Sequence, residues 1–265
     1  MKAKSIMIGG LCVILLGMFQ NVFTKTLEEF FKKKVSLQPG GKVILDNRNG
    51  SVLVEGWDRD EVLIEARIEV KGGNERKLRE TLEEVEVMVD AESDKITIDT
   101  RYPETGFTSI LDVLFGNHVN VNVTYTLMVP YQTNLKIKTT NGRVKVVDVS
   151  GQLMLRTTNG KVEAENVGGV LMARTTNGSV TTRIEKLDAD GEYELITTNG
   201  SIRVYLPSHA AFDVRARTTN GSIETDFPLT IEGKYAGKNV RGRVNGGGPL
   251  FFLETTNGSI RINKF

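Results

Sequence analysis

The side chains that most often carry catalysis or bind metals are sparse in this sequence. Its 265 residues include one cysteine and two histidines, and neither His118 nor His209 has a further ligand residue at metal-binding spacing. Asp58, Asp60 and Glu61 lie together beside a turn, but calcium-binding loops carry oxygen ligands at denser spacing. No Gly-x-Ser-x-Gly sequence is present to expose a nucleophilic serine. We therefore expect no catalytic residues, no metal site and no cofactor.

Four basic residues recur at one position of a repeated segment and could bind an anion. Lys138, Arg156, Arg174 and Arg217 each lie three residues before an asparagine of the repeat. If the repeats stack about 4.8 Å apart, the spacing between charges of neighbouring coils is well inside a Debye length of about 8 Å, and their fields add. An acidic polysaccharide, an anionic lipid or an acidic envelope protein could then bind to the stripe. The alternative is an ordinary solvated surface with local ion pairs.

The repeat itself predicts the architecture. Thr-Thr-Asn-Gly occurs six times at spacings of about 20 residues, with a degenerate copy at residues 47–50, which is typical of repeat folds. Because both residues of Asn-Gly tolerate positive φ, we predict a tight turn at each copy, with φ above zero at Gly160, Gly178 and Gly200. The predicted turn residues are Asn141, Gly142, Asn159, Gly160, Asn177, Gly178, Asn199, Gly200, Asn220, Gly221, Asn257 and Gly258.

Apolar residues alternate with polar ones on both sides of each turn. Around Asn159 the apolar positions are Leu153, Leu155, Val162 and Ala164, and the other copies follow the same rule. This alternation predicts two short strands per repeat, each with one buried face. The strands could form an antiparallel meander or a solenoid in which equivalent residues stack. Near-identical copies favour the solenoid, since stacked Thr and Asn side chains can form ladders.

We therefore predict an all-β protein, a single-stranded β-solenoid or β-helix-like repeat domain over residues 35–265. Residues 131–265 form the Asn-Gly repeat coils, and residues 35–130 form a β-rich part with one short helix. That helix begins at Asn74 and ends near residue 84, with Leu78, Leu82 and Val85 on one face. Trp57 is expected to fill the core of the first coil. The apolar residues 107–115 could be a short helix or an exposed docking patch.

The N-terminal residues 1–24 have the pattern of an export signal. Lys2 and Lys4 precede an apolar stretch over residues 6–19, which as a helix spans about 21 Å. Extended to Phe23 it reaches about 27 Å, close to the 30 Å of a hydrocarbon core. A cleaved signal peptide and a retained anchor over residues 6–23 both remain open. Either places the chain outside the cytoplasm, in the periplasm or on the cell surface, where membrane association through this segment is possible.

Several segments together resemble the bacterial putative-adhesin family, also called toast-rack domains. They are Pro39-Gly40-Gly41, the stretch from Asn49 through Gly56-Trp57-Asp58 to Val62, Val129-Pro130, and the Thr-Thr-Asn-Gly-Ser repeats. The resemblance covers residues 35–265 and implies an exported β-solenoid-like protein of the envelope, in adhesion or envelope-stress signalling. It implies no catalytic residues.

The composition agrees with a binding protein and argues against nucleic acid as the partner. The chain carries 34 Lys and Arg against 33 Asp and Glu, a net charge of +1, whereas nucleic-acid binders depend on excess positive charge. We expect a non-enzymatic, adhesin-like protein that presents a repetitive surface at the envelope. A membrane-anchored envelope-stress signalling module is the alternative, and a polysaccharide-active β-helix enzyme is a more remote one.

Overall fold

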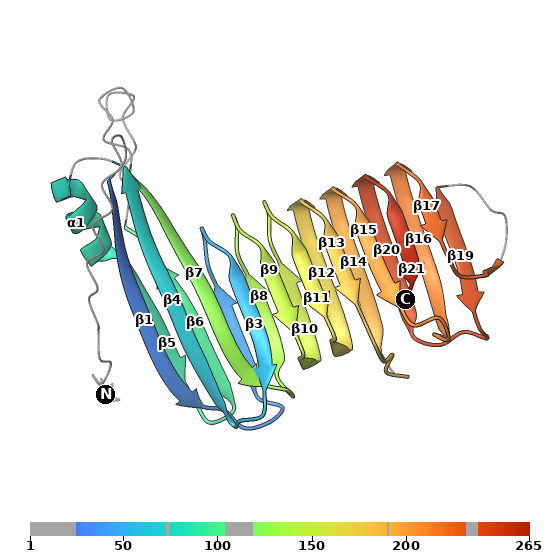
Figure 1. The fold of residues 1–265 in the computed structure, drawn as a ribbon, viewed down its shortest axis with the longest axis horizontal. Helices are drawn as coiled ribbons and strands as arrows, with labels where there is room; N and C mark the ends of the chain where they lie inside the picture. The colour runs from blue at the N-terminus through green and yellow to red at the C-terminus, as the bar shows by residue number, and fades with distance from the viewer. Residues whose placement is uncertain (1–24, 73–74, 104–118, 190, 232–237) are drawn as a thin grey trace, which may run out of the picture.

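The computed structural model describes residues 25–72, 75–103, 119–189, 191–231 and 238–265. Within them the chain forms a ten-stranded sheet, an eleven-stranded sheet and one helix (Figure 1). The predicted signal or anchor, the helix-capping Asn74 and the apolar residues 107–115 lie outside the described residues. In the parts of the chain that are described, no helix has the length and apolarity needed to cross a membrane.

The two sheets contain strands of different length. The order in the ten-stranded sheet is β1 (Thr26–Ser36), β4 (Glu61–Gly72), β7 (Val119–Pro130), β3 (Val52–Trp57), β9 (Val144–Val147), β11 (Val162–Glu165), β13 (Val180–Arg183), β15 (Ile202–Leu206), β21 (Ile260–Lys264) and β17 (Ile223–Thr225). The order in the eleven-stranded sheet is β18 (Thr230–Ile231), β19 (Asn239–Val244), β16 (Phe212–Asn220), β20 (Leu250–Asn257), β14 (Glu192–Asn199), β12 (Gly168–Asn177), β10 (Ser150–Arg156), β8 (Asn134–Lys138), β2 (Lys42–Asp46), β6 (Lys95–Arg101) and β5 (Glu86–Ala91).

Each repeat is one coil of a solenoid. Its first strand lies in the eleven-stranded sheet, the Asn-Gly turn crosses to the other sheet, and its second strand pairs there. Strands of successive repeats are parallel and in register, so that Leu153 lies between Leu135 and Leu171. The strands on either side of an Asn-Gly turn lie in different sheets, which excludes an antiparallel meander. The predicted stacking of equivalent residues is confirmed.

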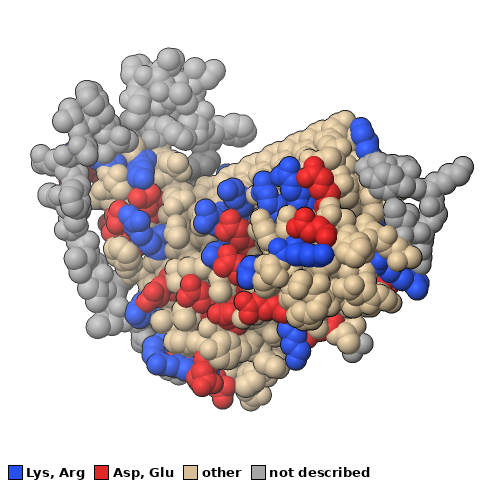
Figure 2. All heavy atoms as spheres, turned by 45° about the vertical axis from the view of Figure 1, so that its right-hand side comes forward, with Lys and Arg blue, Asp and Glu red and all other residues tan. Residues whose placement is uncertain are grey.

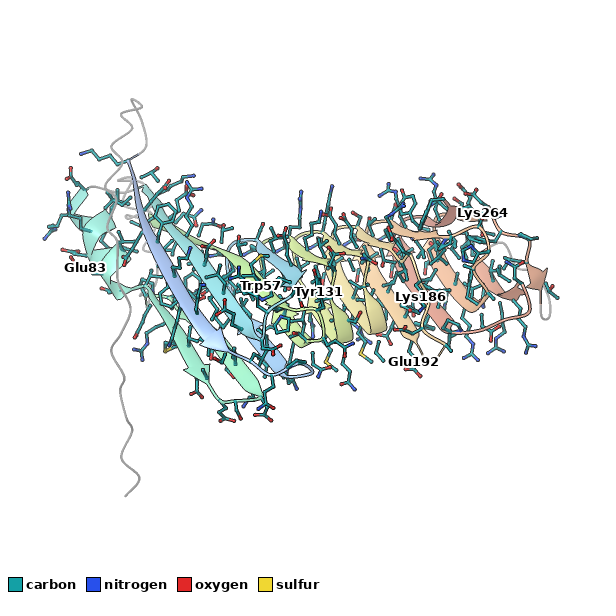
Figure 3. The ribbon with its side chains drawn as sticks, turned by 60° about the horizontal axis from the view of Figure 1, so that its bottom comes forward. Trp57, Glu83, Tyr131, Lys186, Glu192 and Lys264 are labelled. Atoms are coloured by element: carbon teal, nitrogen blue, oxygen red, sulfur yellow. The ribbon has the colours of Figure 1, made fainter. Side chains whose placement is uncertain are left out.

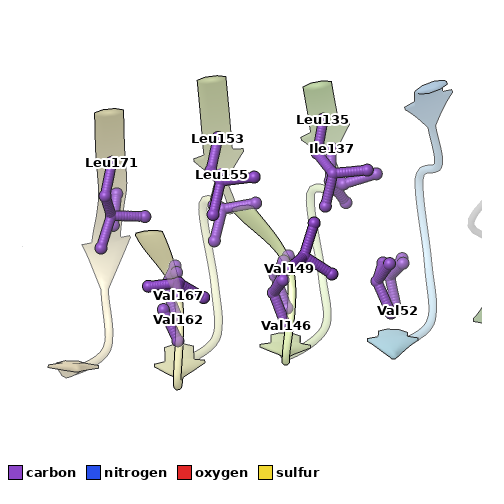
Figure 4. Close-up of a cluster of buried hydrophobic side chains, with 14 of the residues drawn as sticks. Val52, Leu135, Ile137, Val146, Val149, Leu153, Leu155, Val162, Val167 and Leu171 are labelled. Carbon is purple, nitrogen blue, oxygen red and sulfur yellow. The ribbon is translucent and has the colours of Figure 1, made fainter. Parts of the chain in front are cut away.

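The alternating apolar residues fill the space between the sheets. Figure 4 shows Leu135, Leu153 and Leu171 pointing from one sheet toward Val146 and Val162 of the other. All five are at most 1% exposed. Full burial of such a side chain contributes about 1.5–3 kcal/mol, so the repeated pattern supplies one layer of core per coil. The pattern weakens only at Ile223 and Thr225, which are half-buried because β17 is the last strand of its sheet.

The order of the last two coils differs from their order in the sequence. Strand β20 of the final repeat pairs with β14 on one side and with β16 of the preceding repeat on the other. The final repeat is therefore inserted between its two predecessors. Phe251 of β20 stacks on Tyr193 at 4.4 Å between ring centroids and meets the edge of Phe212 at 5.3 Å. This aromatic layer favours the inserted position, and antiparallel β19 covers the far side of β16.

The N-terminal part is β-rich with one helix, as predicted, but its longest strands are antiparallel. Strand β4 pairs antiparallel with both β1 and β7, and β7 then joins the coils through a parallel pairing with β3. Helix α1 (Glu75–Glu84) packs against β1, β4 and β7. Leu78 is fully buried, while Leu82 packs half-buried on the core, which confirms the predicted helix face.

Trp57 does not fill the core of the first coil. It ends β3 half-buried, and its indole N–H donates to the backbone oxygen of Glu61 at 2.8 Å. Arg59 lies over the indole ring at 4.8 Å, and Figure 3 shows Tyr131 beside the tryptophan. The position at the end of the strand explains the difference, since the inward-facing residues of β3 are Val52 and Val54.

Candidate functional site

The Asn-Gly turns line up along one edge of the solenoid because their glycines touch. A Cβ placed on any of Gly142, Gly160, Gly178, Gly200, Gly221 or Gly258 would lie 1.9–2.1 Å from the carbonyl oxygen of the glycine in the adjacent coil. That is far inside any normal contact distance, so only glycine lets the coils approach each other this closely.

The predicted reason for these glycines was therefore wrong at two of three positions. Gly160 and Gly200 do not have positive φ, and Gly178 has φ of 159°, close to fully extended backbone. Backbone strain does not select glycine at these turns. Close approach between coils does.

In every repeat a buried threonine bonds to the glycine carbonyl of the adjacent coil. The first threonine of every Thr-Thr-Asn-Gly copy is at most 6% exposed. Its hydroxyl donates to the glycine oxygen of the adjacent coil over 2.8–3.1 Å, as Thr157 does to Gly142. A buried hydroxyl without a partner is unfavourable by about 1–3 kcal/mol, so these bonds allow threonine inside the core. This role accounts for the first threonine of the repeat, which a hairpin turn does not need.

The asparagines form a continuous ladder on the outside of the same edge. Each side-chain N–H donates to the side-chain oxygen of the preceding asparagine in space over 2.7–2.8 Å. The ladder runs Asn49, Asn141, Asn159, Asn177, Asn199, Asn257 and Asn220. The predicted asparagine ladder is confirmed, with the last two copies exchanged. Because every amide is held by its neighbours, the spacing and orientation of this polar surface are set before any ligand binds.

The first coil ends the ladder with a different set of side chains. Asn47 stands where later coils have threonine, and its amide donates to the backbone oxygen of Val123 at 2.8 Å. The Tyr102 hydroxyl donates to Asn47 Oδ1 at 2.6 Å and accepts from the backbone N–H of Asn49 at 3.1 Å. Burial raises the pKa of Tyr102 above its ordinary value, which keeps the hydroxyl protonated as a donor.

The structure brings three of the four predicted cations together. Lys138, Arg156 and Arg174 are register neighbours on β8, β10 and β12, and all three are exposed. Arg217 is separated from Arg174 by Ile196 and Glu254, because β14 and β20 lie between the two strands. The predicted four-residue column is thus a column of three, because Ile196 interrupts it, as its sequence position already indicated, and the inserted last repeat adds Glu254.

Two further cations lie on the opposite side of the Asn-Gly edge. Arg143 and Lys161 follow the turns of neighbouring coils, at the start of β9 and β11, and both are exposed. We call Lys138, Arg143, Arg156, Lys161 and Arg174 the basic edge. Figure 2 shows an uncharged upper border along the coils, with Lys and Arg gathered beneath it and acidic residues intermixed.

Ion pairs reduce the net charge of the basic edge without removing it. Lys138 contacts Asp46 at 2.7 Å, Arg143 contacts Glu163 at 3.7 Å, and Arg174 pairs with Glu194. For Arg156 and Lys161, the described residues provide no ion-pair partner. Exposed ion pairs contribute about 0–1 kcal/mol, so an incoming anion can replace such partners readily.

The structure also bears on catalysis and metal binding. No group of three or more His, Cys, Asp or Glu residues suited to a metal ion occurs among the residues that are described. A catalytic pair of carboxylates would have to lie on neighbouring coils of the outer face. Glu163 on β11 and Glu224 on β17 are separated by β13, β15 and β21 and form no such pair. His118 lies outside the described residues, and His209 is exposed in a loop.

Two solved structures are among those similar to this chain. A putative cell adhesion protein from Clostridium sporogenes is similar over 89% of this chain and 100% of its own, with a TM-score of 0.51 and 15% identity. A putative adhesin from Bacteroides fragilis covers 89% of this chain and 97% of its own at a TM-score of 0.31 and 9% identity. No curated protein matches the sequence. The model of the family described as Toastrack DUF4097 matches residues 118–263, more than half of the chain, and the chain therefore belongs to that family.

Proposed function

We propose that the protein is an exported, adhesin-like binding protein of the cell envelope, without catalytic activity, that binds acidic polysaccharide along its basic edge. The proposal depends on one observation: the cations of the basic edge lie on both sides of the asparagine ladder. The name of the Clostridium sporogenes protein agrees with a role in adhesion.

The basic edge combines two kinds of contact that suit a charged polymer. Stacked coils repeat about every 4.8 Å, so Arg156 lies within one Debye length of about 8 Å from both Lys138 and Arg174, and the fields of these neighbours add. The adjacent Asn and Thr side chains supply hydrogen-bond donors and acceptors at the same repeat. A chain of acidic sugars can meet several of these groups at once, and weak contacts then accumulate into useful affinity.

The same cations could bind an anionic lipid headgroup or an acidic envelope protein. We favour polysaccharide because the Asn ladder extends well beyond the cations, over seven coils, and a polymer can follow it. A membrane-anchored signalling module would need residues 6–23 to be retained. Fractionating cells and determining the mature N-terminus would separate an anchored protein from a secreted one.

Binding measurements on a charge variant test the proposal. Wild type and Lys138→Gln/Arg156→Gln/Arg174→Gln are titrated with an acidic polysaccharide, a neutral polysaccharide and anionic vesicles at low and raised salt. We expect salt-sensitive binding of the acidic polysaccharide, weakened at least about tenfold in the variant. The control Arg76→Gln/Lys186→Gln/Arg241→Gln removes as much charge away from the edge and should bind like wild type.

Three results would overturn the proposal. Equal binding by wild type and the edge variant would show that the edge is not the site. An equal loss in the control variant would show a bulk charge effect. Binding to vesicles with none to polysaccharide would assign the edge to lipid instead.

A further inference from the structure

Strand β1 ends the ten-stranded sheet with a long edge that no other described strand pairs with. It spans Thr26–Ser36, and its one partner in the sheet is β4. The other terminal strands are shorter: β17 has three residues, β18 two and β5 six. An unpaired edge of this length is a template for pairing with another strand.

The backbone of β1 shows which residues face that edge. At the two ends of the pairing, Leu37 N–H donates to Asp60 O at 3.0 Å and Gly72 N–H donates to Lys25 O at 3.2 Å. Both bonds involve odd-numbered residues on the β1 side. Since alternate residues of an antiparallel strand bond to opposite neighbours, the even-numbered residues of β1 direct their N–H and C=O groups to the free edge.

The side chains of β1 complement a second copy of the same strand. We propose that two copies of this protein pair antiparallel through β1, with Phe31 opposite Phe31 at the twofold axis. The pairs on the inner side of the sheet are then Glu29 with Lys33 and Leu27 with Val35. The pairs on the outer side are Phe30 with Lys32, Glu28 with Lys34 and Thr26 with Ser36.

Every pair in this register is favourable. Opposite charges meet at Glu29–Lys33 and Glu28–Lys34, and each pair occurs twice because of the twofold axis. Directly opposed cross-strand pairs of this kind stabilise antiparallel sheets, whereas like charges destabilise them. In this register the even-numbered residues lie opposite each other. Because their N–H and C=O groups face the free edge, they can form the hydrogen-bonded pairs between the two copies.

The pairing also covers apolar surface and continues existing ion pairs. Leu27, Phe31 and Val35 pack on the core but are only half-buried at this end of the molecule. Phe30 is 46% exposed, so the methylene groups of Lys32 of the second copy, whose ammonium pairs with its own Glu65 at 2.7 Å, would cover its ring. Glu28 already pairs with Arg67, and Lys34 with Glu61, so the new contacts would produce a row of alternating charge.

The run Lys32, Lys33 and Lys34 has a simpler explanation as protection of an edge strand against aggregation. That role explains the lysines but does not explain Glu28 and Glu29. In the proposed register these two residues lie opposite the lysines of the second copy. Strand β5 shows the contrast: it carries the acidic Glu86 and Asp90 and no basic residue, so self-pairing about Met88 would oppose like charges. The complementarity is specific to β1.

Proline at an edge-facing position tests the pairing with little effect on the fold. The N–H of Lys32 is directed away from β4, so Lys32→Pro removes no backbone hydrogen bond within one molecule but blocks the ladder between two. It does remove the exposed ion pair of Lys32 with Glu65 at 2.7 Å, which the control Lys32→Ala removes as well. We expect the full-length protein in non-ionic detergent to be a dimer by sedimentation velocity, with the dissociation constant raised at least about tenfold in Lys32→Pro. Lys32→Ala, which keeps the N–H, should stay within about threefold of wild type.

Disulfide trapping tests the register. In a Cys12→Ser background, Phe31→Cys should cross-link under mild oxidation, because residue 31 opposes itself in a close, non-hydrogen-bonded pair. Phe30→Cys should not, because residue 30 opposes residue 32. A monomeric wild type, a dimer equally stable in Lys32→Pro with a matching circular dichroism spectrum, or cross-linking at residue 30 in preference to 31 would each overturn the proposal.

Discussion

Replacing Gly160 by alanine separates two reasons why a turn can require glycine. Gly160 has no positive φ, but a Cβ there would lie 2.0 Å from the oxygen and 2.6 Å from the carbon of the Gly142 carbonyl. Gly40 is the opposite case: its φ is 80°, and a Cβ would have nothing within 4 Å. Close approach predicts a large effect at Gly160 and a small one at Gly40.

The size of the effect follows from the contacts that must open. To bring the Cβ to an ordinary contact distance, the two coils must part by roughly 1 Å. The Thr157 hydroxyl bond to Gly142 O, now 2.9 Å, would break, and so would the 3.0 Å bond from Gly142 N–H to Asn159 O. Two lost bonds of about 0.5–1.5 kcal/mol each, together with an unsatisfied buried hydroxyl, give a destabilisation of about 3 kcal/mol.

Urea unfolding, followed by far-ultraviolet circular dichroism and by the fluorescence of the single tryptophan, measures both variants. Gly160→Ala should lower the free energy of unfolding by about 3 kcal/mol, and Gly40→Ala by about 1 kcal/mol through left-handed backbone strain. A Gly160→Ala effect equal to or smaller than that of Gly40→Ala would refute the explanation by close approach. It would also remove the physical reason for the glycine in every repeat.

Two further substitutions test the packing and the charges. Thr182 is 1% exposed, and its buried hydroxyl has no hydrogen-bond partner among the described residues. Thr182→Val should therefore raise the free energy of unfolding by about 1 kcal/mol. A decrease in thermal stability would show instead that the hydroxyl has a partner. The hydrogen bond from Arg67 holds the pKa of Glu28 below its ordinary value, so this pair stabilises the fold at neutral pH and the contribution is lost as the pH falls below about 4. Arg67→Gln should therefore flatten the loss of stability between about pH 5 and 3, and an unchanged pH profile would contradict the assignment.

Several features of the protein could be predicted from local sequence because they depend on local rules. The alternation around each Asn-Gly turn marks the inward-facing residues whatever the strands pair with, since successive side chains point to opposite faces of a strand. The repetition of whole tetrapeptides indicated in-register stacking, because the benefit of an Asn ladder exists only between equivalent positions. The amphipathic face of α1 followed from helical periodicity in the same way.

The basic edge was predicted in part. The three cations Lys138, Arg156 and Arg174 come from consecutive repeats, so their alignment follows directly from stacking. Arg217 does not join them, because Ile196 of the intervening repeat interrupts the column and the inserted final repeat places Glu254 between Ile196 and Arg217. The spacing of 37 residues between Asn220 and Asn257, against about 20 elsewhere, was the signal of that departure.

The sequence by itself therefore determined which residues are buried, where the chain turns and that the repeats stack. Tertiary structure alone decided three further features: the order of the last two coils, the contact that makes glycine necessary, and the free edge of β1. Each depends on residues far apart in the chain. Phe251 meets Tyr193, and Gly160 meets the carbonyl of Gly142, only after the coils have closed. Such contacts leave no local pattern, because the free energy that selects them comes from surfaces that do not exist until the chain has folded.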